Sequence, residues 1–192
     1  MNLDLTYGFG VMEKSFGTGF IRFDKLGDRR PDIVADFRHM PVREGQADLI
    51  LFDPPHLTAY GLNNAHGLHP IQRRYGTFKN TADMRKSLYQ AFKEIERLLS
   101  SDGLCVLKWN SYMKSLRWVL SLTNLKVETV HETKSHTNKT RNQKTDWVTF
   151  TRKSAVTCIC DCLNEECDCR YCDCPNPCDC GRPFQTRLEA SL

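Results

Sequence analysis

Residues 48–56 read Asp-Leu-Ile-Leu-Phe-Asp-Pro-Pro-His and form the most informative segment of the chain. The apolar run at 49–52 is continuous, which is typical of a strand buried on both faces of a parallel sheet. Two prolines then end the strand and fix a rigid, extended loop, because neither can donate a ladder hydrogen bond. Such a loop holds the Asp53 carboxylate and the Pro54 carbonyl as fixed acceptors facing one planar amino group. A plain Pro-Pro turn with a solvated Asp53 is the alternative interpretation.

Short apolar segments recur along the chain and alternate with amphipathic ones. Strands are expected at residues 2–5, 20–23, 33–35, 48–52, 103–109, 125–130 and 147–151, and helices at 82–99 and 111–122. The last two strands are expected to be joined by a polar stretch, 131–146. This alternation predicts an α/β fold with a Rossmann-like sheet, helices on both faces, and ligands bound at the carboxyl ends of the strands.

Acidic residues stand at the ends of three successive predicted strands. Asp4 opens a strand-to-turn segment in which Gly8 and Gly10 let the backbone approach a bulky ligand. Asp24 follows Asp4 by 20 residues, at the end of the next strand, where a carboxylate can accept both hydroxyls of a ribose. At Asp36, which ends the third strand, a carboxylate or its neighbouring backbone can reach an adenine. A plain tight turn is the alternative for the two glycines.

A second glycine pair, Gly17 and Gly19, offers a competing place for the ligand-binding turn. It would leave Asp24 only five residues further on, too close for the next strand. These two glycines are therefore expected to shape the turn into the second strand. No G-x-x-x-x-G-K-[ST] loop occurs in the chain, which excludes the usual nucleoside-triphosphate site.

Asp53-Pro54-Pro55-His56, directly after an apolar strand, resembles the D/N-P-P-[aromatic] signature of class I S-adenosylmethionine-dependent methyltransferases that modify exocyclic amines of nucleic-acid bases. Residues 4–10 resemble the first motif of that family, and the likeness extends in order over roughly residues 2–152. The resemblance implies a class I methyltransferase sheet that binds S-adenosylmethionine. The implied donor-binding residues are Asp4, Thr6, Gly8, Gly10, Asp24, Asp36 and Phe37, and the implied catalytic residues are Asp53, Pro54, Pro55 and His56.

The resemblance also implies direct transfer of the methyl group to a base nitrogen, with Asp53 and the Pro54 carbonyl orienting the amino group. The family usually places Tyr, Phe or Trp where this chain has His56, which offers less stacking area to a base. The chain also has no large target-recognition domain. Duplex recognition of the restriction-modification kind is therefore not expected.

Charge and two long loops predict a nucleic-acid partner, DNA or RNA. Residues 1–157 carry 24 basic and 16 acidic side chains, a balance that suits a polyanion but is also common on solvated surfaces. A segment at 57–81 is expected to cover the site, and a cationic stretch at 134–144 is expected near it. The predicted substrate-binding residues are Tyr60, Arg73, Arg74, Trp109, Lys139 and Arg141. Ordinary mobile loops, and a core position for Trp109, are the alternatives.

The C-terminal segment differs from the rest of the chain. Nine of the ten cysteines lie between residues 158 and 180, in an acidic segment rich in C-x-C pairs that resembles metallothionein. Dense thiolates favour zinc or another thiophilic ion, whereas a disordered tail that binds no metal is the alternative. We therefore expect a methyltransferase domain at 1–153 and a metal-binding tail at 154–192. The predicted ligands are Cys158, Cys160, Cys162, Cys167, Cys169, Cys172, Cys174, Cys178 and Cys180.

Composition limits the remaining possibilities. The chain has 192 residues, of which 40% are hydrophobic, with ten Phe, six Tyr and three Trp, so disorder throughout is excluded. No apolar run approaches the length of a membrane span, and no signal peptide is recognisable, so a cytoplasmic protein without membrane partners is expected. An inactive methyltransferase-like binding protein, or a methyltransferase for a protein or small-molecule amine, remain alternative functions. The sequence does not indicate the oligomeric state.

Overall fold

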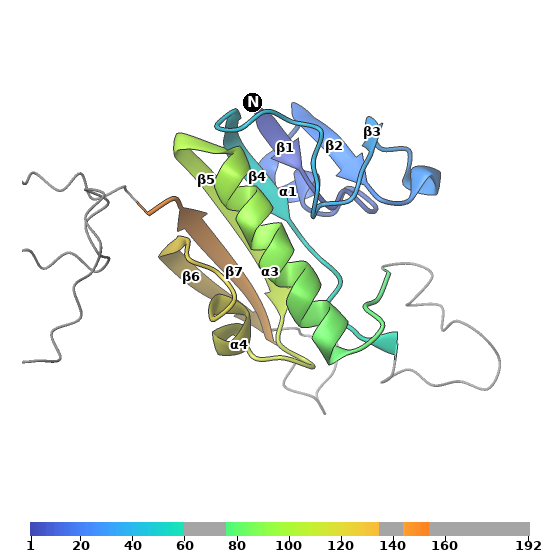
Figure 1. Cartoon of the computed structure of the whole chain (residues 1–192), viewed down its shortest axis with the longest axis vertical. Helices are drawn as coiled ribbons and strands as arrows, with labels where there is room; N and C mark the ends of the chain where they lie inside the picture. Colours follow the sequence, from blue (N-terminus) through green and yellow to red (C-terminus); the bar gives the residue numbers. More distant parts are fainter. Residues whose placement is uncertain (60–75, 135–143, 154–192) are drawn as a thin grey trace, which may run out of the picture. The chain divides into compact units, whose positions relative to one another are not determined.

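The computed structural model describes residues 1–59, 76–134 and 144–153. The chain divides into residues 1–153 and residues 154–192, and all described residues belong to the first unit. Seven strands form one sheet in the order β3-β2-β1-β4-β5-β7-β6 (Figure 1). Their bounds are β1 Asn2–Asp4, β2 Phe20–Asp24, β3 Ile33–Val34, β4 Ala47–Phe52, β5 Leu99–Asn110, β6 Lys126–Lys134 and β7 Lys144–Thr151. The helices are α1 Glu13–Phe16, the 3-10 turn η1 Gly27–Arg29, α3 Thr81–Leu98 and α4 Leu116–Leu120.

The first five strands are parallel, whereas β7 pairs antiparallel with both β5 and β6. The strand order reverses between β1 and β4, because β2 and β3 extend from one side of β1 and β5 from the other side of β4. In open α/β sheets, a ligand binds where the order reverses, outside the carboxyl ends of the strands. The predicted acids of β1, β2 and β4 therefore lie at this edge.

The long helix α3 covers one face of the sheet. Asn80 caps it by accepting a hydrogen bond from the Asp83 N–H at 2.9 Å, which satisfies one of the free donors of the first turn. Its apolar side chains recur every three to four residues and are buried. Phe92 lies at their centre, edge-on to Phe52 of β4 and Phe150 of β7, with ring centroids 6.1 and 5.9 Å away. The helix therefore joins the two halves of the sheet through one core.

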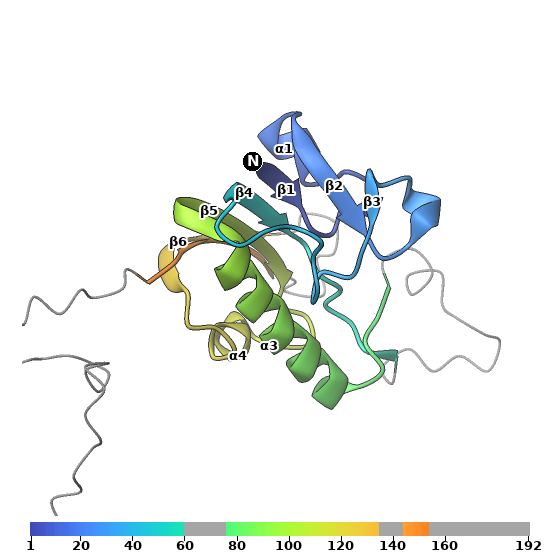
Figure 2. The ribbon, with the colours of Figure 1, turned by 45° about the horizontal axis from the view of Figure 1, so that its top comes forward.

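The two faces of the sheet are covered unequally. Val119 of α4 belongs to the same core as α3, and the two helices lie on the same side (Figure 2). The second face has a small separate core of Met12, Phe20, Leu51 and Val106. Within the described ranges, α1 is the only helix near that second core. Phe16 of α1 packs against Trp147, with ring centroids 6.0 Å apart. No helix of the described ranges is long and apolar enough to cross a membrane.

The predicted strands are all present, but several boundaries differ from the sequence expectation, and β5 begins at Leu99 instead of residue 103. The helix expected at 111–122 is only α4, because Asn110 Oδ1 accepts from the Tyr112 N–H and starts a turn instead. Met113 consequently lies outside the helix, with its sulfur 3.4 Å from the Thr58 N–H. The polar stretch 131–146 was expected to be a loop, but its two ends extend β6 and β7, supported by a Lys144–Glu132 ion pair of 2.9 Å.

Candidate active site

Strands β4 and β5 bring Asp53 and Lys108 together at the carboxyl edge of the sheet. Phe52 of β4 pairs with Leu107 of β5. Asp53 and Lys108 directly follow these two residues, so their side chains project together from the face opposite to Phe52 and Leu107. Lys108 Nζ lies 2.7 Å from Asp53 Oδ2, and the two side chains are only 24% and 26% exposed. Lys108 was missed in the sequence. A lone lysine at the end of the apolar run 104–107 was the signal that could have found it.

Asp53 is also connected to the end of β1, the neighbouring strand on its other side. The Asp53 N–H donates to Thr6 Oγ1 at 2.6 Å, and the Thr6 N–H donates to Asp4 Oδ1 at 3.1 Å. Thr6 therefore joins the segment predicted to bind a methyl donor to the segment predicted to bind an amino group.

Asp4 is fully buried and only partly hydrogen-bonded. Its Oδ2 atom finds no hydrogen-bond partner among the described residues. Burial raises the pKa of Asp4 to about 7, and the charges of Glu13, Asp53 and Asp24 add to the effect, while the Thr6 N–H opposes it. A buried carboxylate oxygen without a donor is costly. It therefore fits a ligand that brings a charged amino group, and the α-ammonium of S-adenosylmethionine is such a group.

The glycine turn after β1 is bonded to the acid at the end of β2. The Gly8 N–H donates to Asp24 Oδ2 and the Leu26 N–H donates to Asp24 Oδ1, both at 2.8 Å. Each oxygen keeps one acceptor position, so Asp24 can still bind a ribose diol. Gly8 and Gly10 have φ values of +54° and +65°, which residues with a Cβ rarely adopt. These residues fit the ribose side of the donor.

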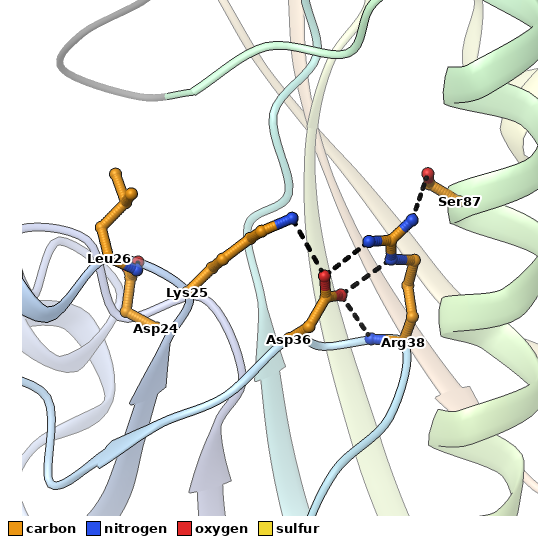
Figure 3. A network of polar contacts seen from close by, with 6 residues as sticks. All are labelled: Asp24, Lys25, Leu26, Asp36, Arg38 and Ser87. Atoms are coloured by element: carbon orange, nitrogen blue, oxygen red, sulfur yellow. Dashed lines mark hydrogen bonds and ion pairs between the residues drawn. The ribbon is translucent and has the colours of Figure 1, made fainter.

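Asp36 is bonded differently from Asp4 and Asp24, as Figure 3 shows. Its oxygens accept from the Arg38 N–H, Nε and Nη2 at 3.1, 2.8 and 2.6 Å, and Lys25 Nζ lies 3.2 Å away. These bonds hold the pKa of Asp36 well below its usual range, mainly through Arg38. A carboxylate has about four acceptor positions, and here all of them are used. In this arrangement an adenine amino group would need the neighbouring backbone as acceptor, or displacement of Lys25.

Of two predicted aromatic site residues, Trp109 belongs to the core and Phe37 packs against it. Phe37 packs edge-on to Phe52, with ring centroids 5.5 Å apart. Trp109 is fully buried, and its indole N–H donates to the Lys114 carbonyl at 2.9 Å. This corresponds to the core alternative considered for Trp109, which contacts the candidate site through His56.

His56 is half-buried beside Trp109 at the end of the Asp53–His56 loop. Its ring lies edge-on to the indole, with centroids 6.4 Å apart. Burial lowers the pKa of His56, and the nearby Lys108 charge adds to this, while Asp53 opposes it. The imidazole is therefore neutral near pH 7 and presents an uncharged ring.

Several predicted residues lie outside the described ranges. They are Tyr60, Arg73, Arg74, Lys139 and Arg141, together with the nine cysteines from Cys158 to Cys180. Within the described ranges, no group of three or more His, Cys, Asp or Glu side chains could hold a metal ion. Zinc binding by the tail stays a prediction, which metal analysis of the purified protein with and without residues 158–192 would test.

No protein-family model matches the sequence, and no curated protein matches it. Solved structures do match the fold. A TehB-like S-adenosylmethionine-dependent methyltransferase from Corynebacterium glutamicum is 16% identical, with a TM-score of 0.50 over 79% of this chain and 79% of that one. TrmN from Thermus thermophilus is 15% identical, with a TM-score of 0.52 over 79% of this chain and 43% of that one. The N-methyltransferase NodS from Bradyrhizobium japonicum is 11% identical, with a TM-score of 0.50 over 79% of this chain and 85% of that one.

These likenesses, at 11–16% identity, concern the fold. The chain has the seven-stranded α/β fold found in S-adenosylmethionine-dependent methyltransferases. The Rossmann-like α/β sheet expected from the sequence is thereby confirmed, while the cysteine-rich tail stays a prediction. What the chain acts on has to be inferred from its own site.

Proposed function

We propose that this protein is a methyltransferase that moves a methyl group from S-adenosylmethionine to an exocyclic amino nitrogen of a nucleic-acid base. The observation that carries the proposal is the hydrogen-bond path from Asp4 through Thr6 to Asp53. This path connects a buried carboxylate, one oxygen of which is a free acceptor, to a rigid loop that carries hydrogen-bond acceptors. A donor with an ammonium group and an acceptor with an amino group would both be held at one edge of the sheet.

On the donor side, the chain supplies acceptors and a close backbone approach. Asp4 Oδ2 would hold the ammonium group, and the remaining acceptor positions of Asp24 would hold the ribose hydroxyls. When bound, S-adenosylmethionine supplies a methyl group on a positively charged sulfur. The positive-φ turn at Gly8 and Gly10 would leave room for the ligand beside the backbone.

On the acceptor side, Asp53 and the Pro54 carbonyl would accept the two hydrogens of the amino group. These two bonds orient the nitrogen lone pair and stabilise the positive charge that develops on the nitrogen during transfer. The neutral ring of His56 would lie against the base. A base inside a duplex cannot reach such a loop, so the target must be flipped out or already single-stranded.

A nucleic-acid substrate is supported by charge and by the Asp-Pro-Pro loop. Residues 1–157 carry 24 basic side chains against 16 acidic ones, which favours a polyanion over a cationic small-molecule amine. The predicted phosphate-binding residues Arg73, Arg74, Lys139 and Arg141 would contribute to this contact.

The test is methyl transfer from labelled S-adenosylmethionine to duplex DNA, single-stranded DNA, transfer RNA and ribosomal RNA, followed by nucleoside mass spectrometry. The Asp53→Ala variant should lose at least ~100-fold in rate, since it removes an acceptor used in the transition state. The matched control is Asp48→Ala, an exposed aspartate at the opposite end of β4.

Label in one polymer that disappears in Asp53→Ala, but not in Asp48→Ala, would support the proposal and identify the base. Donor binding with no label in any polymer would point to a protein or small-molecule amine instead. Absence of donor binding would favour the binding-protein alternative.

A further inference from the structure

We infer that Asp53 and Lys108 act as one electrically neutral acceptor, with Lys108 as the residue that positions Asp53 and cancels its charge. This inference rests on the proposed function and extends it. Lys108 Nζ lies 2.7 Å from Asp53 Oδ2, and about a quarter of each side chain is exposed, so the pair is largely shielded from water. A charge-assisted bond of this length fixes the orientation of the carboxylate.

Three neighbouring strands hold Lys108 in place. Asp53 follows β4, Lys108 lies on β5, and Trp147 of β7 is the register partner of Lys108. The ammonium group lies 5.8 Å from the centre of the Trp147 ring, whose face attracts a cation. The lysine is therefore bound between a carboxylate and an aromatic ring.

The bond to Lys108 leaves one carboxylate oxygen for a substrate. Asp53 Oδ2 is used by Lys108, while no described residue donates to Asp53 Oδ1. Oδ1 and the Pro54 carbonyl can then accept the two hydrogens of one amino group. Because the lysine cancels the carboxylate charge, the Asp53–Lys108 pair is electrically equivalent to a neutral asparagine beside an apolar residue.

This equivalence gives a reason why the first position of the D/N-P-P signature can be either Asp or Asn. With Lys108 present, a change of Asp53 to Asn would leave an unpaired cation next to the nitrogen on which positive charge develops. That repulsion opposes the transfer step, and the partly buried lysine also loses its partner. Removal of the lysine would remove the repulsion and leave an amide oxygen as acceptor.

The test is a rescue experiment in the full-length protein, on whichever polymer the wild type methylates. We expect kcat to fall at least ~100-fold in Asp53→Asn and about tenfold in Lys108→Met. The double variant Asp53→Asn/Lys108→Met should be at least ~10-fold faster than Asp53→Asn alone, with an unchanged Kd for the donor. Lys108→Arg should recover most of the activity lost in Lys108→Met, because it restores the cation.

Lys126→Met is the matched control, since it breaks an exposed ion pair with Glu128 on β6. Combined with Asp53→Asn it should give no rescue. A double variant Asp53→Asn/Lys108→Met that is as slow as Asp53→Asn, or slower, would overturn the inference. Lys108→Gln repeats the comparison if the methionine variant fails to fold.

Thermal unfolding of the same variants separates this inference from the proposed function. If the pair acts as one unit, the loss of Tm in the double variant should be smaller than the sum of the losses in the single variants. Additive losses would overturn the inference even for an inactive protein. A wild type that labels none of the polymers would overturn only the proposed function.

Discussion

Asp4 ends β1 and Asp36 follows β3 by two residues, and the sequence assigned both to the same ligand, yet the two carboxylates are in opposite states. Asp4 is fully buried, and one of its oxygens has no donor among the described residues. Asp36 accepts from Arg38 through three nitrogens and pairs with Lys25. The pKa of Asp4 is raised and that of Asp36 is lowered. Carboxylates at corresponding strand ends can therefore differ in the acceptor positions that they leave for a ligand.

The largest expected effect is on the pH dependence of stability in the donor-free protein. Asp4 has its pKa raised to about 7, so the native state binds a proton more tightly than the unfolded chain. As the pH rises from about 4 to about 7, the unfolded chain releases this proton while the native state keeps it, so the fold loses stability progressively, by an amount on the order of 4 kcal/mol. Asp4→Asn should remove this slope, measured by urea unfolding between pH 4.5 and 8.

Asp36→Asn is the matched control over the same pH range. Because the pKa of Asp36 lies below its usual range, its charge does not change there, and the slope should be that of the wild type. A wild-type slope that persists in Asp4→Asn would contradict the contrast between the two carboxylates.

Donor affinity should show the next largest difference. Asp4→Asn removes a charged acceptor for an ammonium group, so the Kd for S-adenosylmethionine should rise about 10- to 100-fold. Asp36→Asn should change the Kd by less than ~3-fold, because the acceptor positions of Asp36 are already used by Arg38 and Lys25. Isothermal titration calorimetry of both variants at pH 8 measures this. Equal losses would show that Asp36 exchanges Lys25 for the ligand.

The sequence predicted the central strands β4 and β5 well because each contains a continuous apolar run, 49–52 and 104–107, whose burial leaves few alternatives. It also placed Asp4, Asp24 and Asp53 at one edge, since the carboxyl ends of parallel strands must meet there. It did not show that Asp36 is already bonded, because the spacing of Asp36 and Arg38 does not tell whether the guanidinium folds back onto the carboxylate. It missed Lys108 because the pairing partner lies 55 residues away, and only the β4–β5 register brings the two together.

A smaller effect is expected on the stability contributed by Asp36 itself. Its pairing with Arg38 is partly buried, with side chains 23% and 29% exposed, so Asp36→Asn should cost about 1–2 kcal/mol at pH 7. The depressed pKa makes this contribution fully present above pH 4, and it is lost as the pH falls further. Urea unfolding at pH 7 and pH 3 should therefore show a smaller difference between variant and wild type at pH 3. A difference that is the same at both pH values would mean that the ion pair does not supply it.

The smallest expected effect separates backbone strain from ligand contact at the glycine turn. Gly8 and Gly45 have φ values of +54° and +69°, and an added Cβ would meet no heavy atom closer than 3.7 Å at Gly8 and none within 4 Å at Gly45. Alanine at either position should therefore cost about 1 kcal/mol, because the left-handed backbone disfavours a side chain. Of the two glycines, only Gly8 adjoins an acid that we propose to bind the donor, through its bond to Asp24.

Gly8→Ala should raise the donor Kd about fivefold, because the added methyl group stands where the ligand passes the backbone, whereas Gly45→Ala should leave it unchanged. Equal unfolding losses with unequal affinity losses would place the donor against this turn. If both variants bound the donor as the wild type does, the ligand would have to lie away from Gly8, and the free oxygen of Asp4 would need another partner.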